Sequence, residues 1–267
     1  MIILPSFILL LIMLVQNEWI ISVKAILDGS TVDKNEFPFT ASFQNISKNN
    51  EHFCGGIIVH EMFILTAAHC IAGKVIKDIR VVAGSRDLKS IKEYKNVRRI
   101  IQIFKNPNYN KPLPRDNDIA LVKLDGPYKM DKCISKAKLV PEDYRIPDDL
   151  IVHIIGWGVT KSDIKAACGS LKKTKVIVLS HSQCTELYAG KVKVSNTVFC
   201  TTHNSKKNRG ACYGDSGGPV LKDKTVVIGV ISVNYAKAKC GDKNHPDLQT
   251  NVAKYRKWID NIIFSNI

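Results

Sequence analysis

The sequence lacks the features that mark repeat proteins and membrane-spanning proteins. It contains no low-complexity run and no internal repeat at a period of about 20–50 residues, which excludes solenoid architectures. After the N-terminal residues, no stretch is long and apolar enough to cross a membrane as a helix. The 267 residues, 45% hydrophobic and 24% charged, therefore indicate a globular protein, either one large unit or two domains of ordinary size.

The cysteines lack the spacing of a zinc site. No C-x-x-C pair occurs, and the one C-x-x-H, formed by Cys200 and His203, has no second pair at a suitable distance. The eight cysteines, an even number, instead indicate disulfides formed in an oxidising compartment. We expect no metal and no cofactor.

Acidic residues are outnumbered, 24 against 39 Lys and Arg, which gives a net charge of +15. Basic residues concentrate at 95–105 (KNVRRIIQIFK) and at 206–209. No nucleic-acid-binding motif accompanies this charge, so nucleic acid is not an expected partner. The simpler interpretation is a solvated surface that keeps the protein soluble, and the alternative is weak binding of polyanions such as sulfated glycans.

The N-terminal residues resemble a secretion signal. Residues 2–15 are almost wholly apolar but too short to cross a bilayer, as in the core of a signal peptide. We therefore expect residues 1–25 to be a signal peptide and the mature protein to be secreted, extracellular and free of the membrane. Asn45 begins an N-I-S sequon, which makes it a candidate for glycosylation in a secreted chain.

Short runs rich in Val, Ile and Phe alternate with Gly, Pro, Asn and Asp. This pattern predicts many antiparallel strands, as in a sandwich or in barrels. The predicted strands lie within GGIIVHEMFILTA (55–67), IRVVAG (79–84), VRRIIQIF (97–104), IALVKL (119–124), LIVHIIGWG (150–158), KKTKVIVL (172–179), GPVL (218–221) and TVVIGVISV (225–233).

Helical signals are few. SHSQ at 180–183 is typical of a capping box that opens a short helix. Residues 252–264 carry apolar side chains at helical spacing after a capping Asn251, which predicts an amphipathic terminal helix with its basic face outward. A domain junction is expected between about 125 and 148, where Pro and charge accumulate.

Three motifs carry chemistry in combination. LTAAHC (65–70) contains a His that would be structural if it stood alone, and DNDIAL (116–121) contains an Asp typical of a turn. In GDSGGP (214–219) glycines flank a Ser, so the backbone can approach a substrate and the hydroxyl can be exposed. The order His, Asp, Ser indicates nucleophilic catalysis.

These motifs, with CGG (54–56), GWG (156–158) and KYRKWI (254–259), resemble the chymotrypsin/trypsin family of serine proteases. The resemblance implies an all-β chymotrypsin-like fold of two six-stranded antiparallel β-barrels with a C-terminal amphipathic α-helix. Residues 26–267 would form the protease domain. Its N-terminal barrel would span about 26–135, and its C-terminal barrel with the helix about 136–267.

The resemblance also implies a role for each motif. Ser216 would be the nucleophile, His69 its base and later the general acid, and Asp118 would hold the imidazole. The backbone N–H groups of Gly214 and Ser216 would form the oxyanion hole. We therefore expect a secreted, monomeric serine endopeptidase that acts on protein or peptide substrates through an acyl-enzyme and is open to protease inhibitors.

A second hypothesis comes from another functional class. A catalytically inactive homologue could act as a binding module, and the altered wall of the specificity pocket is the one feature in its favour. The complete His–Asp–Ser set argues against it.

The resemblance pairs six of the cysteines as Cys54–Cys70, Cys184–Cys200 and Cys212–Cys240. Cys133 and Cys168 are left over and are paired by elimination. The loop at 84–93, which holds calcium in some relatives, here has scattered Asp and Glu among Lys residues, so no metal is expected there.

The specificity pocket departs from that of trypsin. Gly210 stands where trypsin has a floor Asp, and the wall residues Ser232, Val233 and Asn234 replace the usual Ser-Trp-Gly. Asn234 would crowd the pocket mouth and disfavour large aromatic side chains. Asp247 aligns with the back of the pocket, where it could attract a basic side chain, hold water and backbone donors, or be a loop residue without a substrate role. We expect a chymotrypsin- or elastase-like preference rather than a trypsin-like one.

The stretch SVKAILDG (22–29) raises the question of activation. The resemblance implies that the mature chain begins at Ile26, whose new ammonium group would pair with Asp215. Relatives carry Arg or Lys before that residue, whereas this chain has Ala25. Since small residues at 23 and 25 suit signal peptidase, we hypothesise that one cut after Ala25 removes the leader and exposes Ile26. The alternative is an earlier cut, for instance after Ser22, followed by trimming.

Overall fold

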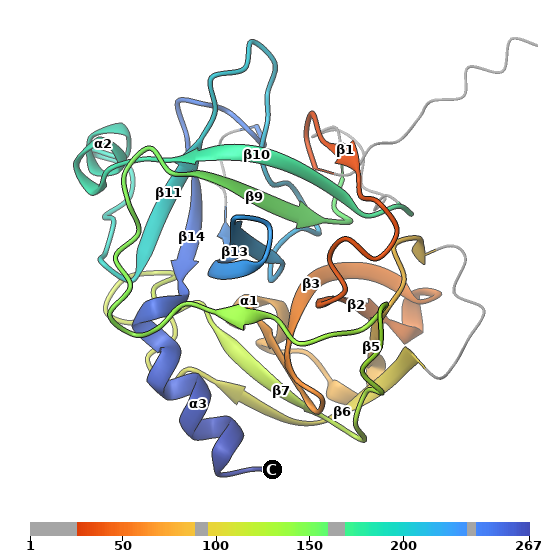
Figure 1. Ribbon diagram of the computed structural model, residues 1–267. Helices are drawn as coiled ribbons and strands as arrows, with labels where there is room; N and C mark the ends of the chain where they lie inside the picture. The colour runs from red at the N-terminus through yellow and green to blue at the C-terminus, as the bar shows by residue number, and fades with distance from the viewer. Residues whose placement is uncertain (1–25, 89–95, 160–168, 234–238) are drawn as a thin grey trace, which may run out of the picture.

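The computed structural model describes residues 26–88, 96–159, 169–233 and 239–267. Strands dominate, and they form two barrels that lie side by side (Figure 1). No helix among the described residues is long and apolar enough to span a membrane.

The first barrel is closed, with the strand order β2-β3-β4-β7-β6-β5. Its strands are β2 (Thr40–Asn45), β3 (Glu51–His60), β4 (Phe63–Thr66), β5 (Ile79–Ala83), β6 (Val97–Lys105) and β7 (Ala120–Leu124). All neighbouring strands are antiparallel. Fully buried apolar side chains such as Phe43, Ile57 and Leu121 fill the interior, as the alternation of side chains along half-buried strands requires.

The second barrel closes because β10 pairs with both β11 and β9. Its strands in ring order are β9 (Ile151–Gly156), β10 (Lys172–Val178), β11 (Val198–Thr202), β14 (Asp247–Asn251), β13 (Val226–Val233) and β12 (Pro219–Lys222). Two short strands add to the ring, namely β1 (Ser30–Thr31) and β8 (Lys138–Leu139). The predicted pair of six-stranded antiparallel barrels is confirmed.

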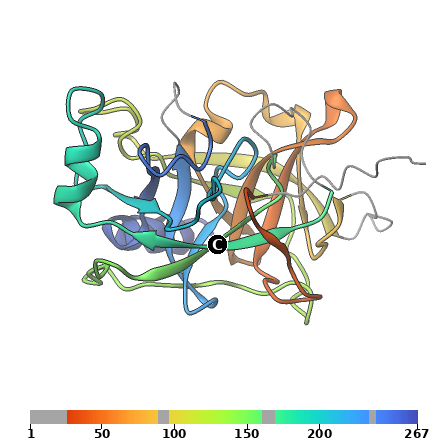
Figure 2. The same cartoon turned by 90° about the horizontal axis from the view of Figure 1, so that it is seen from above.

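The start of the described chain lies on the second barrel. Ser30 and Thr31 of β1 pair with β10, a contact visible in both views of the ribbon (Figures 1 and 2). Leu27 forms an isolated antiparallel bridge with Gly210. Residues 26–31 therefore contact the barrel that carries the Ser216 turn, although they precede every strand of the first barrel in sequence.

The helices are α1 (Ala68–Ile71), α2 (His181–Leu187) and α3 (Arg256–Phe264), with 3₁₀ turns η1 (Ile46–Lys48), η2 (Ile76–Asp78) and η5 (Val252–Tyr255). The predicted capping box is present, since Ser180 and Gln183 satisfy each other's backbone N–H groups. The predicted terminal helix is also present, but its first turn is the 3₁₀ turn η5. The Asn251 side chain accepts a hydrogen bond from the Ala253 N–H and caps that turn.

Three disulfides join Cys54 to Cys70, Cys184 to Cys200 and Cys212 to Cys240. These are the three pairs that the family resemblance implied. Cys133 has no disulfide partner among the described residues, and its expected partner Cys168 lies outside them, so this pairing stays a prediction. The sequon residue Asn45 ends β2, where its Oδ1 atom is buried without a hydrogen-bond partner.

Candidate active site

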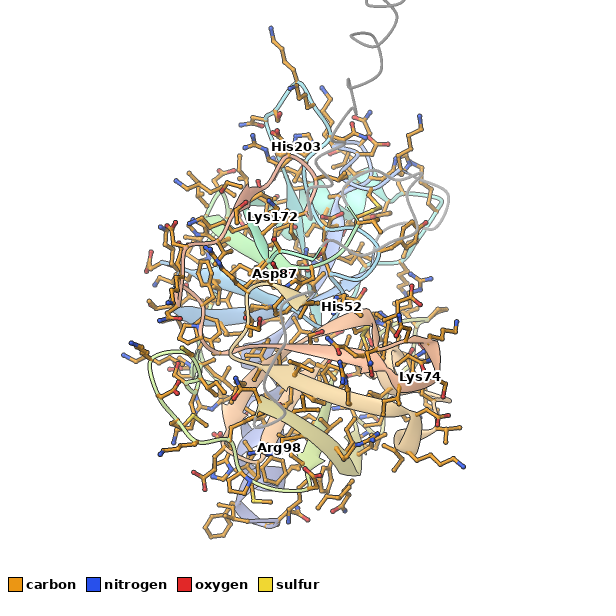
Figure 3. The ribbon with its side chains drawn as sticks, turned by 90° about the vertical axis from the view of Figure 1, so that its right-hand side faces the viewer. His52, Lys74, Asp87, Arg98, Lys172 and His203 are labelled. Atoms are coloured by element: carbon orange, nitrogen blue, oxygen red, sulfur yellow. A yellow bond between two sulfur atoms is a disulfide. The ribbon has the colours of Figure 1, made fainter. Side chains whose placement is uncertain are left out.

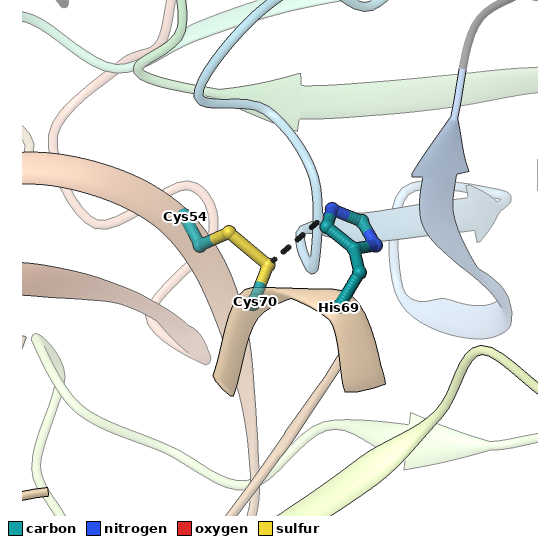
Figure 4. A group of neighbouring side chains, drawn as sticks. All are labelled: Cys54, His69 and Cys70. Atoms are coloured by element: carbon teal, nitrogen blue, oxygen red, sulfur yellow. Dashed lines mark hydrogen bonds between the residues drawn. A yellow bond between two sulfur atoms is a disulfide. The ribbon is translucent and has the colours of Figure 1, made fainter. Parts of the chain in front are cut away.

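His69 is held between the two barrels by a short helix and a disulfide. β4 leads into α1, which carries His69, and the Cys54–Cys70 bond ties α1 to β3 (Figure 4). The Sγ atom of Cys70 lies 3.8 Å from Nε2 of His69. Cys54, His69 and Cys70 resemble a zinc ligand set, but zinc binds thiolates, and these two sulfurs are bonded to each other.

Asp118 lies two residues before β7 and is completely buried. Its Oδ2 lies 2.7 Å from Nδ1 of His69, and its Oδ1 accepts the His69 backbone N–H at 2.9 Å. Burial alone would raise the pKa of the Asp118 carboxyl. The hydrogen bond and charge of His69, with the hydroxyl of Ser232, outweigh burial and hold that pKa below its usual value.

This contact determines the tautomer of the neutral imidazole. A carboxylate only accepts hydrogen bonds, so Nδ1 of His69 carries the proton that points to Asp118. Nε2 then has a free lone pair, which is what a general base needs. Because neither Nε2 nor a disulfide sulfur carries a hydrogen, the 3.8 Å approach of Cys70 is a packing contact.

Ser216 lies in a tight turn that glycine makes possible. Gly214 and Gly217 adopt φ values of 95° and 82°, a region that side chains disfavour. A Cβ atom on Gly217 would collide with the Gly55 carbonyl and the Thr66 hydroxyl. The turn therefore packs directly against the first barrel.

The hydroxyl of Ser216 donates to the carbonyl of Ser232 at 3.1 Å. Among the described residues it has no hydrogen bond to His69, so the predicted nucleophile and the predicted base are not joined in this structure. Catalytic hydrogen bonds often form only when substrate binds, and rotation about the Ser216 Cα–Cβ bond redirects the hydroxyl. In this structure His69 therefore contacts Asp118 directly. Ser216 is linked to Asp118 through Ser232, which hydrogen-bonds to both.

The Ser216 turn presents two backbone donors. In the described part of the chain, the N–H groups of Gly214 and Ser216 donate to no other group. Groups of this kind can bind an oxyanion.

Sequence reasoning missed His52, which lies at the junction of the barrels (Figure 3). Its Nε2 donates to the Gly214 carbonyl at 2.9 Å, and its Nδ1 accepts the Ser42 hydroxyl at 2.8 Å. Burial lowers the pKa of His52 to about 4, so the ring is neutral and this tautomer satisfies both nitrogens. A lone His beside Phe53 and Cys54 gives no signal of this contact.

Asp215, the residue before Ser216, is fully buried. Its carboxylate accepts the N–H groups of Gly158 at 2.8 Å and Cys212 at 2.9 Å. Burial raises its pKa to about 7, and no cation of the described residues forms an ion pair with it. A Cβ atom on Gly156 or Gly158 would collide with the carboxylate, which explains both glycines of GWG.

Ile26, the predicted partner of Asp215, has a completely buried side chain. The Leu27 N–H donates to the Gly210 carbonyl at 3.1 Å, which attaches the segment close to the Asp215 turn. In the full chain the nitrogen of Ile26 is part of a peptide bond, so it gains a charge only when the bond after Ala25 is cut.

Asp247 is a buried residue of β14 rather than a loop residue. Its Oδ2 accepts the Ala211 N–H at 2.9 Å and lies 2.6 Å from the position of a Cβ atom on Gly210. Burial raises the pKa of Asp247 to about 7, and the negative charge of Asp215 adds to the shift. The carboxyl group therefore stands beside the glycine floor predicted for the pocket. Ser232 lies on β13, while Asn234 lies outside the described residues.

Comparison with known proteins adds independent information. Residues 26–259 match the family model described as Trypsin. The chain belongs to the trypsin family. It is a serine protease, a hydrolase of peptide bonds.

The relatives differ in how much of their length is matched. Trypsin from Phaedon cochleariae is 30% identical over an alignment that covers 88% of this chain and 87% of the length of that trypsin. Granzyme M from Rattus norvegicus is 29% identical over 96% of each chain. Ovochymase from Halocynthia roretzi is 30% identical over 88% of this chain, which spans 15% of that protein. The solved structure of neuropsin, a serine protease expressed in the limbic system of mouse brain, superposes with a TM-score of 0.77 at 26% identity. The superposition includes 89% of this trypsin-family chain and the whole of the neuropsin chain.

Proposed function

We propose that this trypsin-family protein is a secreted serine endopeptidase in which Ser216 attacks the peptide carbonyl. His69 takes the Ser216 proton on Nε2 and later returns it to the leaving amine, while Asp118 stabilises the imidazolium. The 2.7 Å contact between Nδ1 of His69 and the buried Oδ2 of Asp118 carries the proposal, because it leaves Nε2 as the free base. The N–H groups of Gly214 and Ser216 bind the oxyanion, and water then hydrolyses the acyl-enzyme.

We propose a preference for uncharged side chains at the residue before the cleaved bond (P1), as in chymotrypsin- or elastase-like enzymes. Gly210 supplies no charge at the pocket floor. The pKa of about 7 keeps Asp247 largely protonated in mildly acidic solution, so the pocket carries little charge there. The substrates are proteins or peptides, and protein inhibitors that present a reactive loop would bind the same cleft.

We propose that residues 1–25 are a signal peptide and that its removal creates the activating N-terminus. The family match begins at Ile26, and the buried Asp215 has no cationic partner in the described part of the uncut chain. An ammonium on Ile26 would supply that partner, because a buried charge needs one. Pairing would hold the oxyanion turn in place.

A fluorophosphonate probe tests the proposal on the chain that begins at Ile26. We expect labelling at Ser216, no labelling of Ser216→Ala or His69→Ala, and normal labelling of the control Ser182→Ala, which changes an exposed Ser of α2. A folded wild-type protein that takes no label would contradict the proposal and favour an inactive binding module.

A further inference from the structure

The segment that follows Ile26 carries a charge that contacts the floor of the specificity pocket. Arg209 donates to Oδ2 of Asp28 through Nε at 3.0 Å and through Nη2 at 2.5 Å. The side chains of both residues are 32% exposed. Neither side chain has another hydrogen bond or ion pair among the described residues.

Leu27 attaches the same N-terminal segment to the second barrel. Leu27, next to Asp28, donates its N–H to the carbonyl of Gly210, next to Arg209. Its side chain is buried in an apolar cluster with Val159 and the Cys212–Cys240 disulfide. Two successive residues after Ile26 thus hold two successive residues at the pocket floor, one through the backbone and one through charge.

Arg209 is itself held from the opposite side. Its N–H donates to the Gly241 carbonyl at 3.2 Å, and a Cβ atom on Gly241 would collide with the Arg209 backbone. His203, at the outer end of the second barrel (Figure 3), donates from Nε2 to the same carbonyl at 2.8 Å. These contacts fix the backbone of Arg209 directly before residues 210–215, which contain both Gly210 and Asp215.

Asp28 lies in a turn with a φ of 53°. This left-handed region favours Gly, and Asp is one of the few other residues that it tolerates. Among the described residues, the Asp28 side chain bonds to Arg209 alone. Asp28 therefore fits the turn and also supplies a charge that a glycine would lack.

We propose that Asp28 and Arg209 form a latch that holds the N-terminal segment against the pocket floor and so positions the Ile26 ammonium at Asp215. The proposal rests on the proposed function. The latch stabilises the active conformation of the cut enzyme relative to a form with a released N-terminus. Asp28 and Arg209 are positioning residues, since neither touches substrate.

The latch has a pH signature. Loss of the proton from the Ile26 ammonium at alkaline pH releases the segment. Because the latch favours the inserted form, it raises the pH at which half of the enzyme has lost this proton. A threefold weaker insertion equilibrium lowers the alkaline midpoint by about 0.5 pH units when insertion is favourable. About threefold is within the range expected of a partly exposed ion pair.

The test uses the chain that begins at Ile26, with Asp28→Asn, Arg209→Gln and the charge reversal Asp28→Arg/Arg209→Asp. Asp260→Asn is the control, because it breaks a partly exposed ion pair on α3 (33% for Arg256, 52% for Asp260) far from the N-terminus in sequence. The readouts are the alkaline limb of kcat/KM and the rate at which cyanate modifies the Ile26 amine.

We expect both single variants to lower the alkaline midpoint by about 0.5 pH units and to raise the modification rate about threefold. The acid limb and Asp260→Asn should match wild type, and the charge reversal should recover part of the loss. If both single variants keep the alkaline midpoint of the wild type and its rate of cyanate modification, the latch proposal is wrong. If the wild type takes no fluorophosphonate label, the proposed function is wrong instead. The latch is then tested by comparing the rates of cyanate modification of the Ile26 amine in the variants and the wild type.

Discussion

The hydroxyl of Ser232 donates to Oδ2 of Asp118, the same oxygen that lies 2.7 Å from Nδ1 of His69. The carbonyl of Ser232 accepts the hydroxyl of Ser216. One residue of β13 therefore contacts both Asp118 and Ser216, the acidic residue and the nucleophile of the proposed mechanism. This contact joins the acidic residue of the first barrel to the second barrel, so the site depends on how the two barrels pack.

Replacing Ser232 with Ala should lower kcat/KM about tenfold, the effect of losing one hydrogen bond to a charged group. The carbonyl of residue 232 remains, so the Ser216 contact survives and the loss reports on Asp118 alone. Steady-state kinetics on a peptide substrate, with Ser182→Ala as control, would measure it. Wild-type kcat/KM in Ser232→Ala would show that the carboxylate needs only His69.

Asp247 should make the specificity depend on pH. Its carboxyl has a pKa of about 7 because it is buried, so it is mainly neutral at pH 6 and mainly ionised at pH 8.5. The ratio of kcat/KM for a Lys substrate to that for a Leu substrate should therefore rise severalfold across this interval. Asp247→Asn should remove the rise, whereas Asp223→Asn, at an exposed turn, should keep it. A rise that persists in Asp247→Asn would place its origin elsewhere.

Asp215 should make the uncut chain less stable as pH rises. The folded carboxyl keeps its proton up to about pH 7, while the reference value is 3.8. The folded state therefore binds more protons between these values, and the free energy of unfolding falls as pH rises through that window. The fall should be on the order of a few kcal/mol.

The measurement compares two Ser216→Ala chains, one that begins at Val23 and one that begins at Ile26. Urea unfolding at pH 5 and pH 7.5 should show the larger fall in the chain that begins at Val23, because the Ile26 ammonium compensates Asp215 in the other. Both chains also carry Asp247→Asn, because the charge of Asp215 shifts the pKa of Asp247 and its titration would otherwise differ between them. Equal falls in the two chains would contradict the Ile26–Asp215 ion pair.

The Cys54–Cys70 bond should serve both stability and catalysis. Replacing both cysteines with Ala should lower the free energy of unfolding by about 3 kcal/mol and slow fluorophosphonate labelling, since the bond fixes α1 and His69. The Cys184–Cys200 pair closes a loop of the same sequence separation, 16 residues. Its removal should cost similar stability but leave labelling near wild type. Equal labelling in the two double variants would limit the first bond to a structural role.

Several strands were predictable from local pattern, and others were not. Runs such as IALVKL alternate or accumulate apolar residues, and the structure has β7 there. β14 reads DLQTN, a polar run, yet Gln249 and Thr250 are fully buried. Their side chains bond to Thr201 and to the Asp118 carbonyl, and hydrophobic periodicity cannot detect a polar strand buried in this way.

The sequence by itself determined the identities and order of the His, Asp and Ser, many of the short strands and the terminal helix. These follow from motif order and side-chain pattern, which a chain carries without its fold. The three disulfide pairs and the two barrels were implied by the family resemblance that the motifs carry. Only the tertiary structure decided that Ser232 joins Asp118 to Ser216, that His52 bonds to the Gly214 carbonyl, and that Asp28 contacts Arg209. These contacts join residues far apart in the chain, and burial of Asp215 and Asp247 shifts their pKa values only once the barrels exclude water.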